Sequence, residues 1–529
     1  MYYLRIYSII LGSILLVLYA CKPISSQNEE QAPPNILFCI ADDASFPHMG
    51  AYGTQWISTP AFDQVAAEGL LFMRAYTPNA KCAPSRSCII TGRNSWQLEE
   101  AANHWPVFPQ KFKSVVEVLD EVGYDVGFTG KGWGPGKALD EEGNPRNLVG
   151  NPYRSYKLEA PAQHISTEDY ARNFEAFLDS AQEDKPFFFW YGGFEPHRSY
   201  EFGAGINKGG KQLGDVDRVP EFWPDSDTVR TDMLDYAYEI EYFDQHLGRM
   251  LELLKDRGLA ENTLIVVTAD NGMPFPRVKG NNYEMSNHLP LAISWPKGIQ
   301  TPGREVLDMV SFIDFVPTFL DLAGVSPLQS GMQPVTGKSL TPIFDNSLDD
   351  GEDFRDYVLI GKERHDLGRP GDGGYPVRGI VTSEWLYLHN FEPDRWPAGN
   401  PETGYLNVDG SPTKTEILNL RRNGGAKTYW DWSFGKLPQE ELYRLSEDLE
   451  CLNNLVVMGE SNPVKEELKS QLFDLLVQER DPRILGEGKI FDSYPYSDEA
   501  SRNFYERFMK GEKLNSGWVN PTDFEKNIE

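Results

Sequence analysis

Short apolar runs alternate with amphipathic stretches over the first 340 residues of the chain. Residues 35–41, 186–191 and 263–269 are rich in strand-forming residues and have the length of buried strands. Between them, residues 171–181 and 231–254 repeat their apolar positions at helical spacing. Strands that alternate with helices predict an α/β fold with a large, mostly parallel central sheet flanked by helices on both faces.

The pattern changes beyond residue 344. An acidic stretch at 345–353 is expected to be a linker, and residues 465–479 form one amphipathic helix pattern. The strand-like segments of this region are 357–361, 377–382, 385–389 and 440–445. We therefore predict a main domain over 35–344 and a smaller α+β domain with an antiparallel sheet over 355–485. The polar segment 486–529, with scattered aromatic residues, is predicted to be a surface strap.

The N-terminus has the pattern of an export signal. Arg5 precedes an apolar run at 9–18, which has the length of a signal-peptide core and is short for a membrane span. The run ends in Leu-Tyr-Ala-Cys at 18–21, which resembles the lipobox of bacterial lipoproteins. The resemblance implies a signal peptide over 1–20, acylation of Cys21 and a flexible tether over 21–34. The protein would then be an exported bacterial lipoprotein, held on a membrane in the periplasm or at the cell surface. A plain signal peptide beside an incidental cysteine is the alternative.

The net charge of −29 narrows the range of partners. Such an acidic chain is unsuited to non-specific nucleic-acid binding, so we expect no nucleic-acid partner. An anionic substrate would need a local positive site within a repulsive overall field.

The number of cysteines argues against a disulfide framework. The chain has five, and with Cys21 and Cys82 assigned to chemistry an odd number remains. One pair among Cys39, Cys88 and Cys451 stays open.

Acidic and amide side chains follow two of the predicted strands. Asp42 and Asp43 follow the first strand, and Asp270 and Asn271 follow the strand at 263–269. Ligands of open α/β sheets bind beyond the carboxyl ends of the strands, so these groups can converge. An oxygen-rich cluster suits a hard cation, and the predominance of protein ligands favours one Ca²⁺ over Mg²⁺. No cysteine or histidine pair has zinc spacing.

A longer motif indicates the chemistry. Residues 82–86 are Cys-Ala-Pro-Ser-Arg, and Thr-Gly-Arg follows at 91–93. This segment resembles the signature of type I sulfatases, in which a maturating enzyme oxidises the cysteine to formylglycine. The resemblance implies an alkaline-phosphatase-like sandwich fold and a nucleophile at Cys82 that also contacts the metal. A hydrated aldehyde has one hydroxyl to attack sulfur and a second through which sulfate is later expelled. Arg86 is expected to hold the modified side chain.

Three further cations match family positions around the sulfate. Lys131 lies in Thr-Gly-Lys-Gly, His197 in Glu-Pro-His-Arg, and Lys279 nine residues beyond Asp270. One departure stands out, because Trp133 occupies the position where many sulfatases have a histidine. Tryptophan cannot accept a proton, so another group, for which His104 is a candidate, would have to act there.

Within the sulfatases, the chain most resembles the heparan N-sulfatases. The resemblance rests on segments 195–198, 270–276, 376–378 and 389–391. It implies an exo-acting enzyme that removes the N-sulfate from a terminal glucosamine of heparan sulfate or heparin. His365, Asp366 and Arg378 lie near family positions that contact substrate, and His104 is added as a further substrate-binding candidate.

Three other functions stay open. The nearest is an O-sulfatase that acts on another glycosaminoglycan or an algal glycan. A phosphatase or phosphodiesterase of the alkaline phosphatase superfamily is more distant, because only eight histidines occur and none cluster as zinc ligands. A binding-only lipoprotein for sulfated glycans is disfavoured by the intact nucleophile motif.

Overall fold

The computed structural model describes residues 32–348, 353–456 and 461–525. The predicted signal peptide, Cys21 and most of the tether lie outside the described residues, as does part of the predicted linker. The chain divides into Met1–Pro33 and Pro34–Glu529, and the second unit contains all the elements below. The residue boundaries of the predicted domains within it stay predictions.

The larger sheet has eight strands and is mostly parallel. Only β10 runs antiparallel to its two neighbours, β9 and β2. In spatial order the strands are β11 (Arg304–Val306), β2 (Leu70–Phe72), β10 (Leu291–Ser294), β9 (Thr263–Ala269), β1 (Asn35–Ala41), β8 (Phe187–Gly192), β5 (Asp125–Gly130) and β7 (Asn151–Pro152). The predicted parallel sheet is therefore confirmed, and its central strands are the continuous apolar runs of the sequence.

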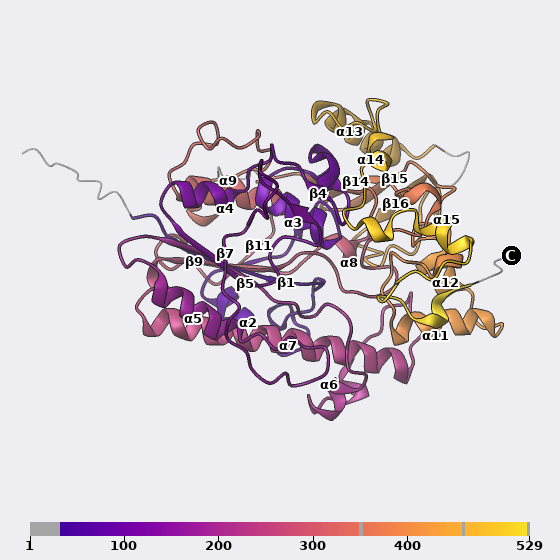
Figure 1. Ribbon diagram of the computed structural model, residues 1–529, viewed down its shortest axis with the longest axis horizontal. Helices are drawn as coiled ribbons and strands as arrows, with labels where there is room; N and C mark the ends of the chain where they lie inside the picture. Colours follow the sequence, from indigo (N-terminus) through magenta and orange to yellow (C-terminus); the bar gives the residue numbers. More distant parts are fainter. Residues whose placement is uncertain (1–31, 349–352, 457–460, 526–529) are drawn as a thin grey trace, which may run out of the picture. The chain divides into compact units, whose positions relative to one another are not determined.

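Successive side chains of β1 enter two different cores, because side chains of a strand alternate between the faces of a sheet. Leu37 and Cys39 join the core under α2 (Pro60–Ala67), α5 (Tyr170–Ser180) and α7 (Asp227–Asp256). Phe38 joins the core under α3 (Cys82–Thr91), α4 (Val115–Glu121) and α9 (Phe315–Leu322). Figure 1 shows these two groups of helices on opposite sides of the sheet.

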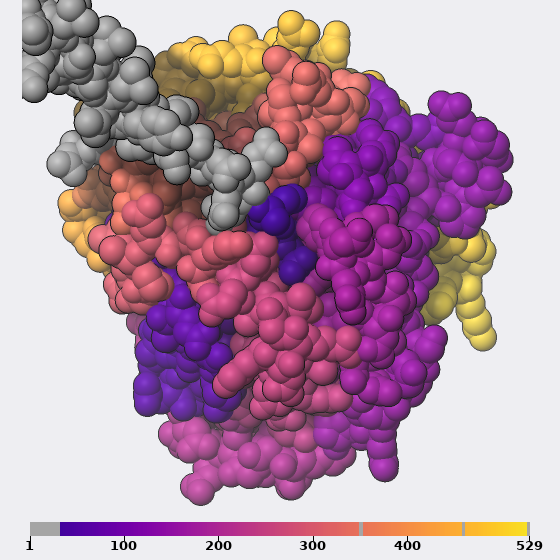
Figure 2. Space-filling view, turned by 90° about the vertical axis from the view of Figure 1, so that its left-hand side faces the viewer, coloured from indigo at the N-terminus to yellow at the C-terminus, as the bar shows by residue number. Residues whose placement is uncertain are grey.

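Strand β1 is almost completely buried, because it lies in the middle of the sheet. On the face shown in Figure 2, the magenta and salmon middle of the chain forms most of the surface, and the indigo beginning of the described chain shows only in smaller patches. The side chain of Phe38 is completely buried, with the ring of Trp190 at 4.9 Å. Removing such a ring costs about 3–5 kcal/mol of stability.

The second sheet is antiparallel, as predicted. Its strands, in spatial order, are β13 (Tyr357–Lys362), β14 (Val377–Thr382), β15 (Trp385–Asn390) and β16 (Glu440–Arg444). Leu468, Leu472 and Leu476 of α13 (Pro463–Gln478) pack on one face of it. The other face packs against Tyr76 and Tyr283. These two residues belong to segments near the eight-stranded sheet, so they connect the two sheets.

The remaining elements are short. Two small sheets pair β12 (Val310–Ser311) with β3 (Ala75–Tyr76) and β4 (Val107–Phe108) with β6 (Lys137–Ala138). The other helices are α6 (Ala204–Asn207), α8 (Glu284–Asn287), α10 (Thr341–Phe344), α11 (Pro412–Arg422), α12 (Thr428–Phe434), α14 (Ile490–Ser493) and α15 (Phe504–Met509). Within the described ranges, no helix combines the length and the apolar character that a membrane crossing requires. The four described cysteines are all free and buried.

Candidate active site

Two neighbouring strands deliver the acidic cluster to one place. β1 and β9 are parallel and in register up to their last residues, so the residues that follow them emerge side by side. Asp42, Asp43, Asp270 and Asn271 are all at most 1% exposed. The backbone N–H of Asp43 donates to Asp270 Oδ1 at 3.1 Å, and Asn271 Nδ2 donates to Asp43 Oδ1 at 2.7 Å. The predicted convergence of these four residues is therefore observed.

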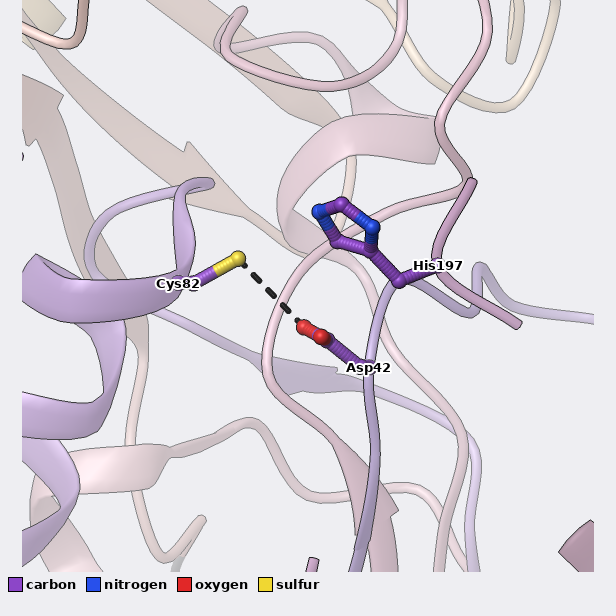
Figure 3. A group of neighbouring side chains, drawn as sticks. All are labelled: Asp42, Cys82 and His197. Carbon is purple, nitrogen blue, oxygen red and sulfur yellow. Dashed lines mark hydrogen bonds between the residues drawn. The ribbon is translucent and has the colours of Figure 1, made fainter. Parts of the chain in front are cut away.

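The nucleophile candidate begins a helix that points at this cluster. Cys82 is the first residue of α3, whose ten residues are all buried. Its Sγ lies 3.3 Å from Asp42 Oδ1 (Figure 3) and 3.8 Å from Asp43 Oδ1. The partial positive charge of a helix N-terminus favours an anionic ligand at this position. The helix ends at Gly92, which has a φ of 65°, and a Cβ there would lie 2.8 Å from Val316 Cβ. That constraint explains the glycine of the Thr-Gly-Arg motif.

Arg86 ties the helix to the strand ends. It lies one turn after Cys82 and is fully buried. Its Nε donates to Asp270 Oδ2 at 2.8 Å, and its Nη1 donates to the carbonyl oxygens of Lys131 at 2.9 Å and Gly132 at 2.7 Å. The guanidinium therefore fixes the position of Cys82 relative to both the acidic cluster and the loop that carries Lys131.

Two lysines compensate the carboxylates. Lys131 Nζ lies 2.5 Å from Asp42 Oδ2, and Lys279 Nζ lies 2.6 Å from Asp43 Oδ2. Burial raises the pKa of Asp42, but the charges of Lys131, His197 and Arg86 together outweigh it, and the pKa is lowered to about 2. Burial alone would lower the pKa of Lys279, but the carboxylates of Asp409 and Asp43 raise it well above its usual range. Both lysines are thus fixed positive charges.

His197 is held in one orientation on a separate segment. Its Nδ1 lies 2.5 Å from the carbonyl oxygen of Arg198, so Nδ1 carries a proton and donates it. Its Nε2 faces Asp43 Oδ2 at 3.9 Å, and the side chain is 36% exposed. Figure 3 shows the imidazole beside Asp42 and Cys82. Nε2 is therefore the nitrogen that is available to a bound ligand.

The cluster has the composition of a site for a hard divalent cation. One ligand atom from each of Asp42, Asp43, Cys82 and Asp270 lies within 4.8 Å of the others. Asn271 Oδ1 is buried and makes no hydrogen bond. A buried amide oxygen without a partner is costly unless something binds it. These residues fit a cation that takes carboxylate and amide oxygens.

The unmodified thiol of Cys82 is a poor nucleophile in this setting. Burial, and then the charge of Asp42, raise its pKa well above the usual range. Because the thiolate is the nucleophilic form of cysteine, the side chain as encoded is inert at neutral pH.

The site opens onto one cavity of about 810 Å³. Its lining includes Asp42, Cys82, Lys131, His197 and Lys279. A cavity of this size is typical of small-molecule sites.

The four predicted substrate-binding residues separate into two pairs. His104 and Asp366 line the cavity, and their side chains are joined by a 3.0 Å hydrogen bond between Nδ1 and Oδ1. Burial lowers the pKa of His104 to about 4, so its imidazole is neutral. Its Nε2 is buried and makes no hydrogen bond. The structure does not bring His365 or Arg378 to the cavity.

The positions of those two residues have a simple physical cause. His365 is fully buried and its Nε2 contacts Asn79 Oδ1 at 2.8 Å. Arg378 is fully buried too, and its guanidinium binds Asp481 at 2.7 Å and Glu363 at 2.7 Å. A guanidinium with two carboxylate partners is a structural ion pair in this core, so Arg378 does not contact a ligand in the cavity.

Trp133 lies in the cavity wall, where many sulfatases have a histidine. Its Nε1 donates to Ser87 Oγ at 2.9 Å. The indole therefore braces the second turn of α3 and offers no proton acceptor.

The structure adds two residues that the sequence did not single out. Lys81 precedes Cys82 and pairs with Asp366 at 2.7 Å, and Asp409 pairs with Lys279 at 2.9 Å. Both line the cavity. The position of Lys81 directly before the nucleophile motif was a usable signal. Asp409 lies in an irregular segment far from every motif, and nothing in its sequence context marks it.

Comparisons with known proteins agree with this geometry. Human N-sulphoglucosamine sulphohydrolase is 28% identical over 510 residues, which cover 89% of this chain and 93% of that protein. An ulvan-active sulfatase of Formosa agariphila is 27% identical, over 91% of this chain and 90% of its own length. A solved structure described as a complex with its substrate D-glucosamine-2-N,6-O-disulfate superposes with a TM-score of 0.57 and 21% identity. It covers 85% of this chain and 98% of that one, which shows the shared alkaline-phosphatase-like fold.

The sulfatase family profile matches residues 34–325. This range spans both strand ends, the nucleophile motif, Lys131, His197 and Lys279. Because the match covers more than half of the chain, the protein belongs to the sulfatase family and is a sulfuric ester hydrolase.

Proposed function

We propose that the enzyme removes the N-sulfate from glucosamine at the end of heparan sulfate or heparin chains. The observation that carries this proposal is the similarity to the human N-sulphoglucosamine sulphohydrolase over nearly the whole of both chains. The overall reaction converts a sulfamate and water into an ammonium and sulfate. It needs a proton on the nitrogen as the nitrogen–sulfur bond breaks.

Cys82 is proposed to act as formylglycine, whose hydrate supplies the hydroxyl that attacks sulfur and the hydroxyl through which sulfate is released. A bound Ca²⁺, held by Asp42, Asp43, Asp270, Asn271 and residue 82, would activate that nucleophile and polarise the sulfate. The raised pKa of the unmodified thiol supports the need for conversion.

The basic side chains of the site have two proposed roles, as fixed positive charges and as a general acid. Lys131 and Lys279 stay protonated, which suits them to hold the sulfate oxygens. His197 is the proposed acid for the departing nitrogen. Its Nδ1 is committed to the Arg198 carbonyl, so its Nε2 is the atom that carries a transferable proton when the imidazolium forms. An amine is a poor leaving group unless it is protonated, so this group matters most for N-desulfation.

The sugar is proposed to lie against Lys81, His104 and Asp366. These three side chains are joined to one another and lie beside the nucleophile, since Lys81 directly precedes Cys82. The buried Nε2 of His104 and the carboxylate of Asp366 offer hydrogen-bond partners for sugar hydroxyls.

Matured enzyme and three substrates test this function. The substrates are a saccharide ending in N-sulfated glucosamine, a 6-O-sulfated saccharide and an aryl sulfate, and the readouts are sulfate and free amine. We expect release of both from the N-sulfated saccharide. His197→Ala should lower turnover on it by about a hundredfold or more, as expected for loss of a general acid, and should affect the aryl sulfate much less. Lys279→Ala should lower both alike.

His164→Ala is a matched control for His197→Ala. His164→Ala changes another histidine of the same cavity and should leave the ratio of the two activities unchanged. Equal losses on both substrates in the His197 variant would refute the acid role. No amine release by matured wild-type enzyme would refute N-desulfation.

An O-sulfatase is the second candidate function. The ulvan-active relative has nearly the same identity and coverage as the N-sulfatase, and the substrate in the similar solved structure carries a 6-O-sulfate as well as an N-sulfate. Sulfate release from the 6-O-sulfated saccharide alone would favour this function.

A further inference from the structure

Glu239 is a buried carboxyl group that none of the functions above uses. It lies on α7, is 3% exposed, and lines the same cavity as Cys82 and His197. It makes no hydrogen bond and no ion pair with any residue in the ranges 32–348, 353–456 and 461–525. A buried carboxyl group is costly without a partner, and a ligand in the cavity that Glu239 lines can supply one.

The neighbouring charged groups are already committed to other partners. Arg198 forms a bidentate pair with Asp232 at 2.7 and 2.8 Å and donates its Nε to the carbonyl oxygen of Pro274. Glu195 accepts hydrogen bonds from the N–H of Ser166 and the hydroxyl of Tyr170. Asp235 accepts from the N–H groups of Gly203 and Gly205. Glu195 and Glu239 both line the cavity, and of the four carboxyl groups named here only that of Glu239 has no hydrogen-bond or ion-pair partner in the described part of the chain.

The charges around Glu239 decide its protonation. Burial, and then Glu195 and Asp235, raise its pKa well above the usual range, against the opposing effect of Arg198. Tyr200, the other titratable neighbour, is neutral at physiological pH because burial raises its own pKa. A carboxyl group kept neutral by an apolar, acidic environment has an O–H to donate and an oxygen that accepts.

The acidic surroundings of Glu239 also favour a neutral ligand group over an anionic one. A sulfate placed here would lie near the carboxylate of Glu195, which also lines the cavity, and the charge of Arg198 is already matched by Asp232. A neutral hydroxyl group meets no such repulsion and can both donate and accept.

We propose that Glu239 is a specificity-determining residue, whose carboxyl group hydrogen-bonds an unsulfated hydroxyl of the saccharide on the α7 side of the cavity. This inference rests on the proposed function only in taking the ligand to be a sulfated saccharide. It adds that one side of that saccharide must be free of sulfate.

Two substitutions of Glu239 and one control test the proposal. Glu239→Gln keeps a neutral donor and acceptor of the same shape, whereas Glu239→Leu removes both. Asp244→Asn, farther along α7, is the control, because it neutralises a buried acid that does not line this cavity. Each variant is measured for KM and kcat on the N-sulfated saccharide and on an aryl sulfate, which has no sugar hydroxyl.

We expect Glu239→Leu to raise KM for the saccharide about tenfold and to leave the aryl sulfate unchanged. Glu239→Gln should stay within about threefold of wild type at neutral pH. As pH rises, wild-type KM for the saccharide should increase when Glu239 ionises, and the Gln variant should lack that increase.

Three results would overturn the proposal. They are an unchanged KM in Glu239→Leu, a loss in Glu239→Gln as large as in Glu239→Leu, and equal losses on both substrates. If Glu239→Leu does not fold, the pH profile of Glu239→Gln decides. If the wild-type enzyme does not cleave the N-sulfated saccharide, the proposed function fails, and the same comparison is made on the sulfated saccharide that it does cleave.

Discussion

Calcium should stabilise the folded protein through the acidic cluster, even when Cys82 is unmodified. A ligand that binds only the native state raises the free energy of unfolding by about 2.7 kcal/mol when its concentration is a hundred times its dissociation constant. The unfolding entropy of about 2.1 cal/mol/K per residue gives about 1.1 kcal/mol/K for a chain of 529 residues. Saturating Ca²⁺ should therefore raise the melting temperature by about 2–3 °C, and chelation should reverse the change.

Asp270→Asn is the informative variant, because it removes one charge from the cluster and keeps the side-chain shape. A charge pair about 4 Å apart contributes about 4 kcal/mol at an effective dielectric constant of 20. Loss of one such interaction weakens Ca²⁺ binding by several hundredfold. At the same Ca²⁺ concentration the remaining stabilisation falls to about 0.1 kcal/mol. The Ca²⁺-dependent change in melting temperature should then be too small to measure.

Differential scanning fluorimetry over a Ca²⁺ titration measures both effects. Asp244→Asn is the matched control, because Asp244 is a buried acid of α7 that accepts hydrogen bonds from the N–H groups of Ala61 and Phe62, away from the cluster. Its variant should keep the full shift. A full shift in Asp270→Asn, or none in the wild type, would refute the assignment of the cation to this cluster. A Mg²⁺ titration with a larger shift than Ca²⁺ would change the identity of the ion.

Three further predictions concern separate parts of the chain. The matured peptide that contains Cys82 should be about 18 Da lighter than the unmodified one, from oxidation of thiol to aldehyde, and full activity with an intact thiol would contradict the mechanism. Burial lowers the pKa of His48 to about 4, so the unfolded chain binds a proton that the native state does not between pH 6.5 and 4. Urea unfolding should therefore show a smaller loss of stability toward pH 4 in His48→Gln, and an equal loss would exclude this contribution. Cys21→Ala should move the protein from the membrane fraction to the soluble fraction, and an unchanged distribution would show another anchor.

The parts of the site that the sequence predicted are those encoded by local patterns. Continuous apolar runs marked β1 and β9, and polar residues directly after them marked the cation cluster, because parallel strands end at one edge. The nucleophile and Arg86 are four residues apart on one helix, so their geometry is set by the helix itself. These arrangements need no knowledge of how distant segments pack.

The residues that sequence analysis misplaced or missed depend on tertiary packing. His365 and Asp366 are adjacent in an irregular segment after β13, where no periodicity fixes which side chain faces the cavity. Arg378 matched a family segment, but its carboxylate partner Asp481 lies 103 residues later in the chain. Glu239 sits within an ordinary amphipathic helix pattern, and only the packing of α7 beside the cavity distinguishes it.

Cation binding at the acidic cluster would rearrange the local charge and help this acidic enzyme to bind an anion. In the structure, Lys131 and Lys279 are paired with Asp42 and Asp43, the carboxylates that would also bind Ca²⁺. A divalent cation bound to those oxygens would compete with the two ammonium groups and free them to hold an anionic ligand. Binding of sulfate and binding of Ca²⁺ should therefore strengthen each other by the same factor.

Inorganic sulfate and Ca²⁺, titrated separately and together against the melting temperature, measure this coupling. Together they should stabilise the wild type by more than the sum of their separate effects, and Lys279→Met should reduce the excess. Strictly additive shifts would show that the lysines keep their carboxylate partners when Ca²⁺ binds. The positive site that an overall charge of −29 requires would then come from the cation alone.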